Sequence, residues 1–179
     1  MKGSLCVLAL LFAQATLAVA PAAVAKPSDI RVFDFANAAY KDFCGVGAVR
    51  LRRGEFRRAE SAGNPPIEAH LVGVKFGDVL HNGKTQALVD SWCSAGGAGI
   101  FSFVSVYALA SDKLVKIADV ANGDRSWGGI LRSAVENGSI VVEQCLPEDL
   151  CRYSKLTTFR WDGKKFAALH VIKHLSGEQ

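Results

Sequence analysis

Short turn signals recur along this chain and separate runs of alternating apolar and polar residues. Asn-Gly or Asp-Gly pairs occur at 82–83, 137–138 and 162–163. Such pairs favour tight hairpin turns, because both central residues of these turns need a positive φ angle. Further turn signals, rich in Gly, Asn, Ser or Asp, lie around Gly54 and at 63–66, 94–99 and 111–113. A chain interrupted this often has little room for long helices.

The runs between these turns have the period and composition of β-strands. In residues 100–109, IFSFVSVYAL, Phe101 and Tyr107 share one face and Val104 and Val106 share the other, so this strand is apolar on both faces and is predicted to be central. We expect an all-β fold, mainly an antiparallel meander of about eight to ten short strands, propeller-blade-like or sandwich-like. At most one short helix is expected, near residues 34–45.

The first 25 residues have the three parts of a secretory signal peptide. A basic Lys2 precedes an apolar run from Leu5 to Ala20, and Ala23-Val24-Ala25 is a small-x-small cleavage site. The apolar run is short for a membrane span, which needs roughly 20 strongly apolar residues. We therefore predict a signal peptide at 1–25, a single β-rich domain at 26–179, and a periplasmic or secreted protein with no transmembrane segment after cleavage.

The composition of the predicted mature chain limits its partners. Cleavage removes one lysine from a sequence with a formal net charge of +4, which leaves a mildly basic protein. Nucleic-acid binding usually requires a stronger basic footprint, so no nucleic-acid partner is expected. The sequence predicts no cofactor and favours a monomer.

Four cysteines remain after cleavage, and an even number in an exported chain favours disulfides. Four cysteines allow three connectivities. The short loop between Cys145 and Cys151 favours that pair, which leaves Cys44 with Cys93. A zinc site is the alternative, but the chain has no C-x-x-C pair and an oxidising compartment disfavours free thiolates.

Four segments occur in an order that resembles a family of secreted or periplasmic bacterial proteins of uncharacterised function. They are DFANAAYKDFCG at 34–45, VKFGDVLHNGKTQALV at 74–89, NGDRSWGGILRSAVENGSIVVEQC at 122–145 and TTFRWDGKKF at 157–166. The second is similar to a V-x-[YF]-G-D-x-x-G-D-G-x-x-E-A-x-V pattern, and the others to a G-D-R-x-x-G-G, E-N-G and W-D-G series. The resemblance implies a small exported β domain, partly like a single propeller blade, and implies no reaction.

The family pattern suggests what the loop after Gly77 derives from. In the fuller pattern, acids stand at the positions of Asp78, Asn82 and Gln86, as in a loop that holds a hard cation. Calcium prefers six to eight oxygen ligands, several of them charged. Only Asp78 keeps a charge here, so these residues form a weak candidate site and no metal is predicted. We expect Asp78 to cap backbone N–H groups across a tight Asn82-Gly83 turn.

Five arginines within nine residues form the strongest charge cluster: Arg50, Arg52, Arg53, Arg57 and Arg58. A hairpin turning near Gly54 would place Arg50 and Arg52 on one face, away from Val49 and Leu51. Guanidinium groups suit phosphates and carboxylates. The functional interpretation is docking to an anionic envelope component or an acidic protein. The alternative is a solvated hairpin whose charges block edge-to-edge aggregation.

Trp127, in a glycine-rich loop, is the second candidate contact residue; it is either a ligand platform or a lid over the core. Together these features predict a non-catalytic binding or interaction protein. The alternative is a hydrolase that acts on envelope material. No catalytic residue can be assigned from the sequence. A hydrolase would require a histidine within about 3.5 Å of a Ser, Thr or Cys in a cleft.

Overall fold

The computed structural model describes residues 29–61, 63, 65–96, 99–124, 126, 129–146 and 151–175. The predicted signal peptide and Trp127 lie outside these residues. The elements are η1 (Ile30–Val32), η2 (Phe35–Asn37), β1 (Ala39–Tyr40), β2 (Val49–Arg50), β3 (Glu55–Arg58), β4 (Ile67–Gly77), β5 (Gln86–Ser94), β6 (Phe101–Ala110), β7 (Lys113–Asp124), β8 (Ile130–Glu136), β9 (Ser139–Cys145), β10 (Tyr153–Trp161) and β11 (Phe166–Leu175). The predicted all-β class is confirmed. Its comparison with a propeller blade or a sandwich stays a prediction.

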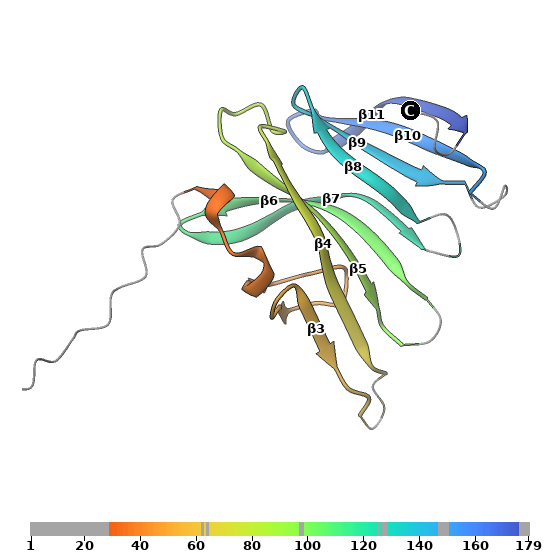
Figure 1. Cartoon of the computed structure of the whole chain (residues 1–179). Helices are drawn as coiled ribbons and strands as arrows, with labels where there is room; N and C mark the ends of the chain where they lie inside the picture. The colour runs from red at the N-terminus through yellow and green to blue at the C-terminus, as the bar shows by residue number, and fades with distance from the viewer. Residues whose placement is uncertain are drawn as a thin grey trace, which may run out of the picture.

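The strands form two large antiparallel sheets (Figure 1). One sheet has five strands in the order β3-β4-β5-β6-β7, and the other has four in the order β11-β10-β9-β8. Both are meanders, because each strand pairs with its neighbour in sequence. Strands β1 and β2 form a separate two-stranded ribbon. The described chain thus has eleven strands, slightly more than the sequence predicts, because β1 and β2 are only two residues long.

Two-residue hairpin turns with positive φ at both residues occur at three places, whereas at Asn82-Gly83 and Asp162-Gly163 only the glycine has a positive φ angle. Asn137-Gly138 joins β8 to β9 with φ angles of 49° and 74°, and Ser111-Asp112 joins β6 to β7 with 49° and 62°. Arg53-Gly54 makes the same kind of turn, with φ angles of 53° and 85°. These are turns that the sequence predicts, and their primed geometry matches the twist of the paired strands.

The five-stranded sheet is covered on both faces, which accounts for the doubly apolar β6. On one face, the N-terminal segment packs its Phe35, Tyr40 and Phe43 against Val89 and Tyr107 of the sheet. A second cluster on the opposite face joins strands of the two sheets. It consists of Val79, Leu88, Val104, Val106, Ile140 and Val142. Strand β6 lies between β5 and β7, as predicted for a strand that is apolar on both faces.

Residues 34–45 contain less helix than the upper limit expected. A 3-10 turn over Phe35–Asn37 begins at Asp34, whose carboxylate accepts a hydrogen bond from the Asn37 N–H, and the chain then enters β1. Within the described residues, no helix has the length and apolar character needed to cross a membrane.

Candidate functional site

The five arginines, here called the arginine hairpin, lie on β2, on β3 and on the turn between them. The Arg52 N–H donates to the Glu55 carbonyl at 2.8 Å, and the Glu55 N–H donates back to Arg52 at 3.1 Å. Two backbone bonds also hold Gly54, one to Ala36 and one to Leu71, each at 2.8 Å. The turn is therefore fixed both to the N-terminal segment and to β4.

Alternation along β2 aims its arginines at solvent. Val49 and Leu51 are buried and Arg50 and Arg52 are exposed, as the sequence predicts. Strand β3 is the edge of the five-stranded sheet. Its half-buried Phe56 packs against the core cluster that the N-terminal segment and the sheet form together. The neighbouring Arg57 and Arg58 are both exposed.

Carboxylates neutralise little of this charge. Among the described residues, only Arg57 of the five has a carboxylate oxygen within 4.0 Å, that of Glu68 at 3.8 Å, and both side chains of this pair are exposed. Arg50 Nη1 donates to the Asn37 carbonyl at 3.5 Å. Exposed ion pairs contribute about 0–1 kcal/mol each, so the fold does not depend on these guanidinium groups. They remain accessible to an external anion.

In the loop from Asp78 to Gln86, side-chain oxygens accept hydrogen bonds from backbone N–H groups of the same loop. The Asp78 carboxylate accepts from the N–H groups of Asn82 at 3.0 Å and Gly83 at 2.8 Å. Asn82 Oδ1 accepts from the Lys84 N–H at 3.0 Å, and Gln86 Oε1 accepts from the Leu80 N–H at 3.1 Å. In the part of the chain that the structure describes, no group of three or more His, Cys, Asp or Glu side chains is placed to hold a metal ion.

Because the Asp78 carboxylate already accepts two backbone hydrogen bonds, we expect it to stabilise the loop and not to bind calcium. Replacing Asp78 with alanine is expected to lower the free energy of unfolding by about 1–2 kcal/mol, because two N–H groups lose their acceptor. Calcium is expected to leave the melting temperature of the wild type unchanged. Thermal unfolding with calcium and with a chelator checks this, and magnesium serves as the control cation. A calcium-specific rise that disappears in the Asp78→Ala protein would contradict the prediction.

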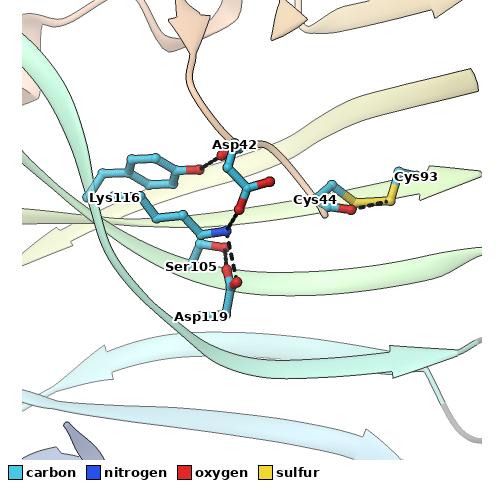
Figure 2. Close-up of polar contacts among 7 residues, drawn as sticks. Asp42, Cys44, Cys93, Ser105, Lys116 and Asp119 are labelled. Carbon is cyan, nitrogen blue, oxygen red and sulfur yellow. Dashed lines mark hydrogen bonds and ion pairs between the residues drawn. A yellow bond between two sulfur atoms is a disulfide. The ribbon is translucent and has the colours of Figure 1, made fainter. Parts of the chain in front are cut away.

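The two disulfides join the pairs favoured by the sequence. Cys44 is bonded to Cys93 with a Cα–Cα distance of 6.1 Å, and Cys145 is bonded to Cys151 with 4.8 Å. The first bond ties the N-terminal segment to β5 (Figure 2). With all four cysteines bonded, none of them is a free thiol for catalysis or metal binding.

A polar cluster beside this disulfide, centred on the Lys116 side chain that is 17% exposed, was not predicted from the sequence. Figure 2 shows the Lys116 ammonium between two carboxylates, Asp42 Oδ2 at 2.7 Å and Asp119 Oδ2 at 2.8 Å. Ser105 donates to Asp119 at 2.6 Å, and the Tyr107 hydroxyl donates to the Asp42 carbonyl at 3.1 Å. The cluster therefore links β6 and β7 to the N-terminal segment.

The neighbours of Lys116 keep its ammonium group protonated. Burial alone would lower the pKa of Lys116, but the hydrogen bonds to Asp119 and Asp42 outweigh it and raise that pKa above its usual value. Burial also raises the pKa of the Tyr107 hydroxyl. A cavity of about 310 Å³ beside the cluster is lined by Tyr40, Lys113 and Leu114, among others. Because its ammonium stays protonated and paired, Lys116 is poorly suited to act as an amine nucleophile.

A second network crosses the four-stranded sheet, with one side chain from each strand. Glu143 on β9 accepts from Arg132 Nε on β8 at 2.6 Å and from Ser154 Oγ on β10 at 2.5 Å. On β11, His174 Nε2 lies 3.1 Å from Ser154 Oγ and 3.5 Å from Glu143 Oε1. The Glu143 side chain is only 8% exposed. The hydrogen bond from Ser154, aided by Arg132 and opposed by burial, lowers its pKa.

The Ser154–His174 pair has the distance that a hydrolase requires but not the environment. Ser154 is fully buried, and its hydroxyl donates to Glu143, which leaves the histidine no proton to accept from it. In a serine hydrolase the acid orients the histidine and the serine hydroxyl faces the substrate. Here the His174 Nδ1 lies 3.1 Å from the Leu175 carbonyl instead. We interpret the network as a structural element of the sheet.

Comparison with known proteins identifies no relative for this arrangement. The chain matches no family model, no curated protein and no solved structure. The family resemblance suggested by the sequence motifs therefore stays a prediction.

Proposed function

We propose that this protein is an exported, non-catalytic binding domain that docks through its arginine hairpin onto an anionic component of the bacterial cell envelope. The observation that carries the proposal is the exposure of all five guanidinium-bearing residues, with a single carboxylate close to one of them. Planar guanidinium groups bind phosphate and carboxylate oxygens in pairs, which suits a polymer or a layer of headgroups. The two disulfides support export to an oxidising compartment.

The position of the hairpin supports a binding role. It lies on the edge strand β3 and is held by backbone bonds, so its arginines are presented from a fixed support and not from a loose tail. Rigid presentation reduces the conformational entropy that binding costs. The hydrolase alternative receives no comparable support, because the serine hydroxyl beside His174 is buried and engaged.

The test compares two variants of equal net charge. Replacing Arg52, Arg53, Arg57 and Arg58 with serine is expected to weaken binding to phosphatidylglycerol-containing vesicles about tenfold or more. The melting temperature is expected to stay nearly constant, because all four side chains are exposed. Vesicle co-sedimentation and thermal unfolding measure the two quantities.

The matched control removes four positive charges elsewhere. Lys84, Lys113, Lys164 and Lys165 are also exposed, and serine at these positions gives the same net charge. This control is expected to keep most of the binding. Equal losses in both variants would show that net charge, not the hairpin, determines retention. Binding of the wild type to polyglutamate but not to the vesicles would favour an acidic protein as the partner.

A further inference from the structure

The last strand, β11, is an open edge of the four-stranded sheet. It pairs with β10 on one side, and the sheet order ends there (Figure 1). Residues 168–173 are all exposed, although side chains on a strand alternate between two faces. Both faces of the strand are therefore open to solvent along six residues.

The exposed side chains of β11 are mainly apolar. Leu169, Val171 and Ile172 are 50%, 60% and 56% exposed. The register with β10 shifts once, between Ala168 and His170, and is regular from His170 to Leu175. The strand is thus regular from His170 to Leu175 and its exposed side chains are mainly apolar, and a regular apolar edge is a template for another strand.

The other three edges of the two large sheets carry features that hinder such pairing. Strand β3 is four residues long and presents Glu55, Arg57 and Arg58 to solvent. The register of β7 against β6 shifts twice, and that strand carries exposed Lys113 and Asp119. Strand β8 has a register shift at Leu131, and its Arg132 and Glu136 are exposed. Charges, shortness and bulges are how natural sheets protect an edge.

We propose that β11 pairs with β11 of a second copy of this chain, antiparallel and about a two-fold axis near Val171 and Ile172. This pairing would extend the two four-stranded sheets into one of eight strands. The charges suit it, because a two-fold axis at Val171 sets Lys173 opposite Leu169 of the other copy, and an axis at Ile172 sets it opposite Val171. No like charges then lie directly opposite each other.

The features of the other three edges favour a closed dimer over a filament. A filament would require β11 to pair with a different edge of the next copy, and each of those edges is charged, bulged or short. Pairing of like with like closes after two copies. This inference is independent of the arginine hairpin, and it departs from the monomer favoured by the sequence.

The test is the association state of the full mature chain and of two lysine variants. By sedimentation equilibrium, the wild type is expected to be a dimer at tens of micromolar and to dissociate on dilution. Val171→Lys is expected to raise the dissociation constant about tenfold or more, because the two-fold axis places the new charge in the interface twice. Val72→Lys replaces a valine that is 65% exposed on β4, and it is expected to dimerise as the wild type does.

Hydrogen exchange of the β11 amides supplies a second readout that does not depend on a variant folding. Protection of these amides is expected to rise with protein concentration, while that of β3 is unchanged. A wild type that stays monomeric at high concentration, with β11 amides that exchange freely, would overturn the proposal. A monomer that pellets with lipid vesicles through β11 would also overturn it and would assign the strand to a membrane surface.

Discussion

Replacing both Cys44 and Cys93 with alanine is expected to lower the free energy of unfolding by about 4 kcal/mol. The bond joins positions 49 residues apart, so it removes a large amount of chain entropy from the unfolded state. It also holds the N-terminal segment, with Phe43 at its centre, against the five-stranded sheet. Urea unfolding of the oxidised wild type and of the double variant measures the difference.

The second disulfide is the internal control for this argument. Cys145 and Cys151 are six residues apart, and the same entropy estimate gives about 2 kcal/mol for replacing both with alanine. We therefore expect loss of the Cys44–Cys93 bond to lower the free energy of unfolding about twice as much as loss of the Cys145–Cys151 bond. If both double variants lost the same stability, contacts in the folded state would be the cause and loop entropy would not.

Glu143→Gln is expected to lower the free energy of unfolding at neutral pH by about 2 kcal/mol. The change removes the charge from a carboxylate that is 8% exposed and that accepts from Ser154 and Arg132. Hydrogen bonds to charged groups contribute about 1.5–3 kcal/mol, and Arg132 would lose the negative charge of its partner. Chemical denaturation over a range of pH measures the effect.

The pH dependence follows from the lowered pKa of Glu143. A folded-state pKa below the unfolded value of about 4.3 means that the unfolded chain binds the proton more tightly. The contribution of Glu143 is then complete above that pH and is lost as the pH falls through the folded-state value. The difference in free energy of unfolding between the wild type and Glu143→Gln should therefore become smaller in acid.

Glu136 on β8 is the matched control, because its carboxyl is exposed. Glu136→Gln is expected to change stability by less than about 0.5 kcal/mol at any pH. If the difference in free energy of unfolding between the wild type and Glu143→Gln stayed constant into strong acid, protonation of Glu143 would not be the cause of the pH dependence.

Local patterns predicted the local parts of this fold. The turn pairs predicted the hairpins at Asn137-Gly138 and Ser111-Asp112, and the two apolar faces of residues 100–109 predicted an internal strand. Alternation also placed Arg50 and Arg52 on the exposed side of β2. Each of these features depends only on residues that are close together in the sequence. Turn residues and the alternation of apolar and polar residues are therefore enough to predict it.

Contacts between distant strands could not be predicted in the same way. Asp42 and Lys116 are 74 positions apart, and nothing in either segment indicates that the N-terminal segment crosses β6 and β7. Glu143 stands at an alternate position of SIVVEQC, where a solvated side chain is normally expected. It is buried because Arg132 and His174 from other strands lie beside it, and single-strand patterns do not record such neighbours.

The row of polar side chains across the four-stranded sheet also fixes how its strands align. Glu143 lies on the face opposite to Ile140 and Val142, which pack between the two sheets. If β9 slipped by one residue against its neighbours, the carboxylate would turn into that apolar layer and leave Arg132 behind. Misaligned pairings therefore carry the cost of an unpaired buried charge. The network thus specifies the strand register, because strands β8 to β11 have one register in which all four of its side chains meet.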